Sequence, residues 1–184
     1  MKDIGLLSYF LVINFEFAES TVHMNQTTYS GRILERFDMQ NCSAKSMLCH
    51  SSVLKIVTEY SQLLNKGTLY QEIVGNLIYA IICTRPALFY FVWKLAQNLS
   101  KPTNANINLA RIYAKVHQRH FTEGLVFCKS EHPLELIGYY DSDFANSSDR
   151  KSLSVFFSLS NNGPLISWNS KKQQIVALKV FVFT

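Results

Sequence analysis

The stretch from Leu134 to Gln174 decides what this chain folds into, and it reads LELIGYYDSDFANSSDRKSLSVFFSLSNNGPLISWNSKKQQ. Side chains alternate with a period of two from Leu134 to Tyr139 and again from Leu153 to Leu159, which is the pattern of a pleated strand. Asn161-Asn162-Gly163 is typical of a hairpin turn that needs positive φ, and Pro164 to Trp168 begin a return strand. The stretch therefore predicts three antiparallel strands joined in chain order.

Two carboxylates, Asp141 and Asp143, stand where the first of these strands ends. Magnesium is a hard cation that prefers oxygen ligands, so this strand end is a candidate Mg²⁺ site.

The same residues resemble the start of the ribonuclease H domain of copia-type retrotransposon polyproteins. Three motifs carry the resemblance: Gly138-Tyr-Tyr-Asp-Ser-Asp-Phe-Ala, Asp149-Arg-Lys-Ser, and Pro164-Leu-Ile-Ser-Trp-Asn-Ser-Lys-Lys-Gln. The resemblance implies that Asp141 is the first catalytic, metal-binding aspartate and that Asp143 is the second Asp of the family's Tyr-Ser-Asp-Ala-Asp-Trp run. The family next opens a helix with a catalytic Glu, and Val182 stands at that position here.

The N-terminal region, 1–40, predicts a hairpin and a helix. Leu6–Phe17 and Thr21–Met24 have the pattern of two strands around Ala18-Glu19-Ser20, with Asn14 and Glu16 on the polar face of the first. Residues 29–37 predict a helix. The motifs Met1-Lys-Asp-Ile-Gly and Ile33-Leu-Glu-Arg-Phe-Asp-Met resemble the hairpin of the family's reverse transcriptase that grips the primer. Val12 replaces the family's Gly, and Asn14 replaces its Glu.

Residues 41–67 predict a linker, in which 53–64 could form a short helix, and residues 68–122 predict three helices. Thr68 with Gln71 suggests a capping box at the start of the first of them. Thr84-Arg-Pro86 ends it and starts the second, and Lys101-Pro-Thr103 starts the third, from about 104 to 120. Three motifs resemble the family's thumb and connection: Tyr70-Gln-Glu-Ile-Val-Gly-Asn-Leu-Ile-Tyr, Cys83-Thr-Arg-Pro and Leu99-Ser-Lys-Pro-Thr. Ala87 replaces the family's Asp after Arg-Pro.

The third helix carries Arg111, Lys115 and Arg119 at intervals of four, so the three positions share one face. A basic helix face can follow a phosphate backbone, and the alternative is an ordinary solvated face. By the resemblance, Lys171 and Lys172 join these as candidate nucleic-acid-binding residues, with an RNA–DNA hybrid or a duplex as the weakly bound partner.

Composition narrows the remaining possibilities. The 184 residues are 48% hydrophobic and carry a net charge of +5, which suits a folded chain and mildly favours polyanion partners. The four cysteines, at 42, 49, 83 and 128, lack zinc spacing and are expected to be reduced. No 18-residue apolar span is present, no signal-peptide cleavage site follows the apolar N-terminus, and no phosphate loop or nucleophile elbow is found. We therefore expect an intracellular chain, cytoplasmic or nuclear and not secreted, with no membrane and no small-molecule substrate.

The sequence as a whole predicts an α+β fold: a hairpin and helix (1–40), a linker (41–67), thumb-like helices (68–122) and an incomplete ribonuclease H-like antiparallel sheet (134–184). Ribonuclease H chemistry uses two divalent metals, which the family holds with about four carboxylates. This chain offers Asp141, with Asp143 less certain, and the polymerase aspartates of the family lie upstream of Met1. We therefore expect a truncated, decayed polyprotein fragment that binds no Mg²⁺ stably and retains weak nucleic-acid binding. The alternatives are a host-recruited binding module and a relic without function.

Overall fold

The structure is a computed structural model that describes residues 5–40, 62–63, 67–119, 122–143, 150–161 and 163–174. The chain divides into two compact units, one made of Met1–Glu16 and His23–Gly124, the other of Phe17–Val22 and Leu125–Thr184. Of the helix proposed over 53–64, only 62–63 are described, and Leu63 forms an isolated antiparallel bridge with Thr103 there. The C-terminal run 175–184 lies outside the described residues.

The N-terminal strands are shorter and more numerous than the sequence predicts. β1 (Tyr9–Phe10), β2 (Ile13–Phe17), β3 (Thr21–Asn25) and β4 (Gly124–Cys128) form a sheet in the order β1-β2-β3-β4. The single strand predicted over Leu6–Phe17 is wrong, because the chain reverses at Leu11 and Val12 and β1 pairs back onto β2. The predicted turn at Ala18-Glu19-Ser20 is confirmed by the 2.9 Å hydrogen bond from Ala18 N to Thr21 O.

β4 was not predicted, since it lies in the segment between the expected helices and the expected C-terminal sheet. Its first residue, Gly124, is required by close packing, because a Cβ there would collide with the main-chain oxygen of Met24 and lie 2.8 Å from His23 Nε2. A glycine at this position therefore lets the strand approach its neighbour.

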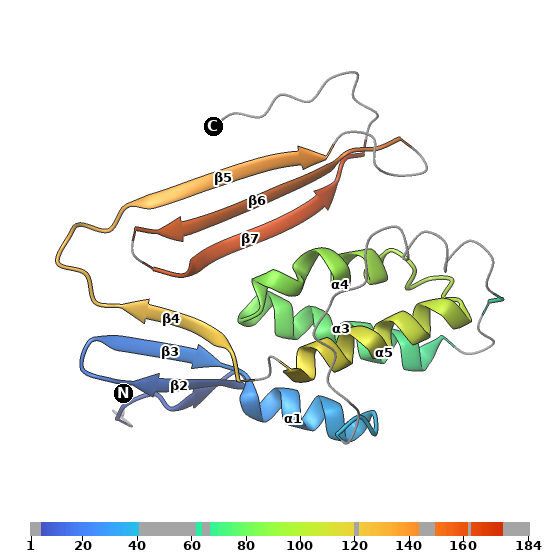
Figure 1. The fold of residues 1–184 in the computed structure, drawn as a ribbon, viewed down its shortest axis with the longest axis horizontal. Helices are drawn as coiled ribbons and strands as arrows, with labels where there is room; N and C mark the ends of the chain where they lie inside the picture. The colour runs from blue at the N-terminus through green and yellow to red at the C-terminus, as the bar shows by residue number, and fades with distance from the viewer. Residues whose placement is uncertain are drawn as a thin grey trace. The chain divides into compact units, whose positions relative to one another are not determined.

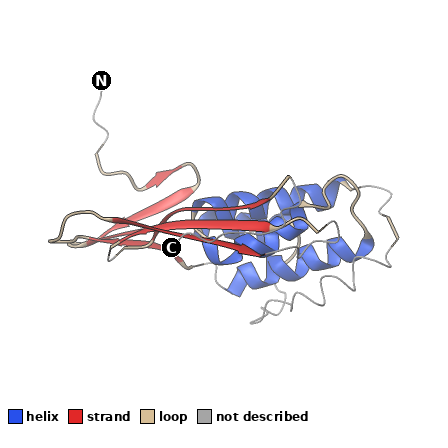
Figure 2. Cartoon of the chain, turned by 90° about the horizontal axis from the view of Figure 1, so that it is seen from above, coloured by secondary structure: helices blue, strands red, loops and turns tan. Residues whose placement is uncertain are grey.

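The helices follow their predicted ranges closely. α1 spans Thr27–Arg36, α3 spans Thr68–Cys83, a 3₁₀ turn η1 (Pro86–Leu88) leads into α4 (Phe89–Ala96), and α5 spans Asn104–Arg119. In Figures 1 and 2, α3, α4 and α5 lie against one another as a bundle. The bundle core consists of twelve buried side chains: Tyr70, Ile73, Val74, Leu77, Ile81, Leu88, Val92, Leu95, Leu109, Ala110, Tyr113 and Val116.

Helix starts differ in how they are capped. The capping box predicted from Thr68 and Gln71 is wrong: Gly67 is the N-cap, it makes no side-chain capping bond, and Gln71 Nε2 donates to Leu99 O at 3.0 Å instead. By contrast, Thr103 and Asn106 cap the start of α5 reciprocally. The Thr103 main-chain N donates to Asn106 Oδ1 at 2.9 Å, and the Asn106 N donates to Thr103 Oγ1 at 3.3 Å.

The C-terminal strands form a separate antiparallel sheet in the order β5-β6-β7, as predicted (Figure 1). β5 is Leu136–Asp143, β6 is Leu153–Ser160 and β7 is Leu165–Lys172. The predicted positive φ in the β6–β7 turn is not found at Asn161 or Gly163, and Asn162 lies outside the described residues. Gly163 is needed for a steric reason instead, since a Cβ there would collide with the Ser160 side chain.

The two faces of this sheet differ in polarity, because directly paired residues point to the same side. One face carries the rows Tyr139–Phe157–Trp168 and Asp141–Val155–Ser170, and the other carries Gly138–Ser158–Ser167 and Ser142–Ser154–Lys171. The first face is thus largely apolar and the second is serine-rich.

The overall class is therefore mixed α+β with antiparallel sheets, as the sequence predicts. Within the ranges that the structure describes, no helix has the length and apolar character needed to cross a membrane.

Candidate nucleic-acid interface

The basic residues of α5 are held by a helix whose opposite side is buried. Ala110, Tyr113 and Val116 are 0–2% exposed in the bundle core. Arg111 is exposed and Lys115 is half-buried, four residues apart on the same side of the helix. Arg119 is the last helical residue, and its side chain lies outside the described set.

No acidic residue occurs in the sequence of α5, NANINLARIYAKVHQR. No carboxylate on α5 itself therefore lies three or four positions from Arg111 or Lys115, where it could form an ion pair along the helix.

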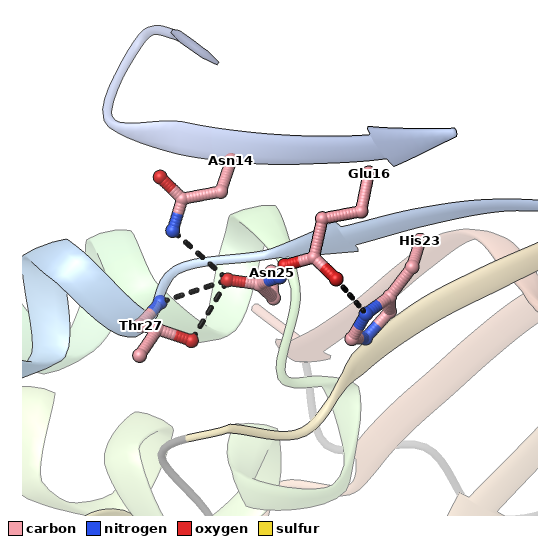
Figure 3. Close-up of polar contacts among 5 residues, drawn as sticks. All are labelled: Asn14, Glu16, His23, Asn25 and Thr27. Atoms are coloured by element: carbon pink, nitrogen blue, oxygen red, sulfur yellow. Dashed lines mark hydrogen bonds and ion pairs between the residues drawn. The ribbon is translucent and has the colours of Figure 1, made fainter. Parts of the chain in front are cut away.

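A polar network joins the N-terminal hairpin to α1 (Figure 3). Asn25, which is 2% exposed, accepts three hydrogen bonds at Oδ1: from Asn14 Nδ2 at 2.9 Å, from Thr27 N at 3.2 Å and from Thr27 Oγ1 at 2.8 Å. Its Nδ2 donates to Glu16 Oε1 at 2.7 Å, and His23 Nδ1 lies 3.5 Å from Glu16 Oε2. The network fixes the direction in which the chain leaves β3 and enters α1.

The sequence predicts only part of this network. Its pattern places Asn14 and Glu16 on the polar side of one strand, but it does not indicate their contacts with His23 and Asn25 across the hairpin. The polar residues His23 and Asn25 alternate along β3, and this alternation is the sequence signal that could have indicated the network. They carry weight only once β2 and β3 are known to be neighbours.

The Leu11–Val12 turn is strained at the position where the family resemblance places glycine. Leu11 has φ 48° and Val12 has φ 57°, the left-handed region that β-branched residues strongly disfavour. Two consecutive positive φ angles are those of a type I′ turn, which normally contains Gly or Asn. A glycine at position 12 would adopt this backbone conformation without the steric cost that valine carries.

Arg85 is a buried cation that sequence reasoning passed over. It follows the end of α3, is 4% exposed, and burial lowers its pKa to about 10 despite the opposing effect of the Glu123 carboxylate. Beside it, Thr84 Oγ1 donates to the buried Gln26 Oε1 at 2.9 Å. Arg85 thus belongs to a buried polar junction and not to an external binding face.

The two carboxylates proposed for metal binding are at the end of β5, as predicted. Asp141 is exposed, and its Oδ1 accepts a 2.7 Å hydrogen bond from Ser142 N. Asp143 is the last residue of β5 and pairs with Leu153, while its side chain is outside the described set. Among the residues that the structure describes, no three His, Cys, Asp or Glu side chains come together as a metal site.

Lys171 and Lys172 end β7, with Lys171 exposed and Lys172 half-buried. Successive residues of a strand face opposite sides, so the two lysines are on different faces of the sheet. Tyr139 stacks on Phe157, with ring centroids 5.0 Å apart. These two rings therefore pack against each other across β5 and β6.

Ser154 Oγ accepts from Tyr140 Oη at 2.7 Å and from Gln173 Nε2 at 2.9 Å, and Ser152 is fully buried. Cys83 and Cys128 are free thiols, whereas Cys42 and Cys49 lie outside the described residues.

No protein-family model and no solved structure matches the chain. Curated proteins do match. The chain is 29% identical, over 97% of its length, to a retrovirus-related Pol polyprotein from transposon TNT 1-94 of Nicotiana tabacum, of which it spans 14%. It is 28% identical to an uncharacterized mitochondrial protein of Arabidopsis thaliana, covering 96% of this chain and 72% of that protein.

A third relative, a secreted RxLR effector protein of Plasmopara viticola, is 32% identical over 61% of this chain and 79% of its own length. The chain is similar over 95–97% of its length to retrovirus-related Pol polyproteins of copia-type transposons, and it spans 12–14% of the length of those polyproteins.

Proposed function

We propose that this chain binds nucleic-acid backbones weakly through α5 and does not cleave them. The observation that carries the proposal is the exposed basic face of α5 around Arg111, on a helix without acidic residues. Phosphate contacts of this kind are independent of sequence and release counterions, so affinity falls with salt. An RNA–DNA hybrid or a DNA duplex is the expected ligand.

The absence of cleavage is proposed from the carboxylates. In this family the reaction takes about four carboxylates around two Mg²⁺ ions. Asp141 could supply one oxygen ligand, and Asp143 follows two residues later on the same side of β5. A pair on one strand would hold a single ion loosely, and Val182 replaces the Glu that the resemblance expects next.

The test is the salt dependence of binding. We expect a log–log slope of about −2.7 on duplex DNA if Arg111, Lys115 and Arg119 each contact a phosphate, at roughly −0.9 per contact. Changing all three to alanine should remove nearly all of that slope in a fluorescence-anisotropy titration.

A matched control distinguishes the effect of losing the basic face of α5 from the effect of lowering the net positive charge of the chain. Arg32→Ala, Lys101→Ala and Lys129→Ala remove the same charge from exposed positions on other segments. This control should keep the slope, and a Lys171→Ala/Lys172→Ala variant reports whether β7 contributes. Equal loss of slope in the control and the α5 variant would contradict the proposal.

A second function, that of a stand-alone interaction module, is favoured by the two short relatives. This chain covers 72% and 79% of them, so the same segment makes up most of two proteins that are far shorter than a polyprotein. If the folded protein fails to bind a hybrid at low salt, this second function is preferred.

A further inference from the structure

β5 is an edge strand, and the residues that point their main-chain groups outward can be identified. Among the described residues, β5 is paired on one side only, with β6. Asn161 N donates to Glu135 O at 3.0 Å, so the main-chain oxygen of Glu135 points toward the β6 side. Because this orientation alternates along an antiparallel strand, every second residue of β5 points its main-chain groups outward. These residues are Leu136, Gly138, Tyr140 and Ser142.

One of these outward groups is already used within the chain. Ser142 N donates to Asp141 Oδ1 at 2.7 Å, which closes that end of the edge. The part of the edge that is left for a further strand therefore runs from Leu136 to Tyr140, with Gly138 at its centre.

The same short segment carries exposed apolar side chains on both faces of the sheet. Leu136 is 66% exposed, Tyr139 is 49% exposed, and Ile137 and Tyr140 are each 39% exposed. Leu136 and Tyr140 lie on the serine-rich face, whereas Ile137 and Tyr139 lie on the apolar face. Each face of the edge thus presents one aliphatic and one aromatic side chain.

We propose that β5 of one copy pairs antiparallel with β5 of a second copy, centred on Gly138, so that the two sheets become continuous. Gly138 then lies opposite the second copy's Gly138. Leu136 lies opposite the second copy's Tyr140, and Ile137 opposite its Tyr139, so each aliphatic side chain meets an aromatic one. Every outward main-chain group from Leu136 to Tyr140 gains a hydrogen-bond partner.

Other registers satisfy this edge less well. Centred on Tyr139, the pairing places Leu136 opposite Ser142, whose N–H is already bound to Asp141. Centred on Tyr140, it places Gly138 opposite Ser142. Centres before Gly138 require residues that precede Leu136, the first residue of β5. The hydrogen bonds therefore favour Gly138 as the centre, and a symmetric pair of this kind closes after two copies.

The same register opposes two carboxylates. Glu135 lies across from the second copy's Asp141, and both residues are exposed. Like charges that are directly opposite each other weaken strand pairing. A single strand edge is also smaller than the interfaces of stable complexes, which bury roughly 800 Å² per partner. We therefore expect a weak dimer whose affinity rises when one of these charges is removed or reversed.

Sedimentation velocity over a range of concentrations tests the proposal, with a chelator present so that no divalent cation bridges the carboxylates. The wild-type chain should approach a dimer and grow no further. Glu135→Lys should tighten the dimer by about tenfold, because both opposed pairs become attractive. Glu131→Lys makes the same charge change at an exposed residue outside the strands and should leave the affinity unchanged.

Two further variants test the apolar contacts and the register. Leu136→Lys should weaken the dimer by about tenfold, whereas Leu63→Lys, at a side chain that is 63% exposed, should not. Asp141→Asn keeps an oxygen for Ser142 N but removes the charge, so it should tighten the dimer by about threefold. Circular dichroism establishes that each variant remains folded.

Three results would overturn the proposal. The first is a monomer at every concentration or growth beyond the dimer. The second is an equal response of Glu135→Lys and Glu131→Lys, or of Leu136→Lys and Leu63→Lys. The third is a dimer that Asp141→Asn does not tighten, because Asp141 faces Glu135 only when the pairing is centred on Gly138.

Discussion

Tyr79 Oη donates a 2.6 Å hydrogen bond to the main-chain oxygen of Leu11, so α3 holds the strained turn of the N-terminal hairpin in place. The turn keeps two non-glycine residues at positive φ, at a cost of roughly 1–2 kcal/mol for a left-handed residue. The bond joins residues 68 positions apart. The hairpin is thus stabilised by a tertiary contact at a place where its own sequence disfavours the turn.

Replacing Val12 by glycine should therefore stabilise the protein. We expect the free energy of unfolding to rise by about 1 kcal/mol, because glycine adopts φ near 57° without a steric penalty. Urea denaturation measures the change. Val22→Gly, at a β3 position with ordinary φ, is the matched control and should lower stability; a loss in both variants would show that the turn is not strained.

Removing the buried amide of Asn25 should destabilise the fold. Asn25→Ala removes the hydrogen bonds that Asn25 makes with Glu16, with Asn14 and with the start of α1, which we expect to cost about 2 kcal/mol. Asn98→Ala, which removes only a 3.4 Å bond to Lys94 O, should cost much less. Similar losses for both in thermal or urea unfolding would contradict a special role for the Asn25 network.

Stability should fall at high pH through Tyr70. Its buried Oη donates to Leu95 O at 2.6 Å, and burial raises the pKa of Tyr70 well above the ordinary value of 10.0. Because the pKa of Tyr70 is higher in the folded state than in the unfolded state, its hydroxyl contributes fully to stability below pH 10. That contribution to stability is lost as the pH rises toward the folded-state pKa. Unfolding measured between about pH 8 and 11 should show this decline.

Tyr70→Phe provides the check on that prediction. The variant keeps the ring but has no ionisable hydroxyl, so its stability should be lower at neutral pH and should change less above pH 10. An unchanged pH dependence would assign the decline to other groups, among them Tyr29 and Tyr79, whose pKa values are also raised.

The purified chain should leave a labelled RNA–DNA hybrid uncut in Mg²⁺ or Mn²⁺. The reason is that only Asp141 and Asp143 are expected at the proposed metal position, whereas the reaction in this family takes about four carboxylates. Gel analysis of the hybrid gives the readout. Cleavage by the wild type that disappears in Asp141→Asn would contradict the prediction, whereas cleavage that persists in that variant indicates a contaminating nuclease.

Limited proteolysis should cut first between Lys129 and Glu135, where every residue is exposed and none is in a strand. A first cut within Gly124–Cys128 is not expected, because that segment is β4 and strands resist cleavage while they stay paired. Mass spectrometry of early fragments locates the cut, and a first cut after Phe127 would argue against a stable β4.

The sequence by itself determined the helices and the strands of the C-terminal sheet. Leu153–Leu159 alternates with period two, and the apolar residues of 68–83 recur every three to four positions, so local pattern and the buried face agree. Candidate residues such as Arg111 and Asp141 could be placed on elements for the same reason. The type of each residue and its spacing from its neighbours can be read from a single segment of the sequence.

Only the tertiary structure decided β4, the Leu11–Val12 turn, the Asn25 network and the burial of Arg85. Each depends on residues that are distant in sequence. Gly124 packs against Met24, and Tyr79 donates a hydrogen bond to Leu11. The carboxylate of Glu123 interacts electrostatically with Arg85. A positive φ at Val12 violates local preference, so no reading of neighbouring residues predicts it. Local propensity is a weak force, and contacts between distant segments override it where they bury more surface or satisfy more polar groups.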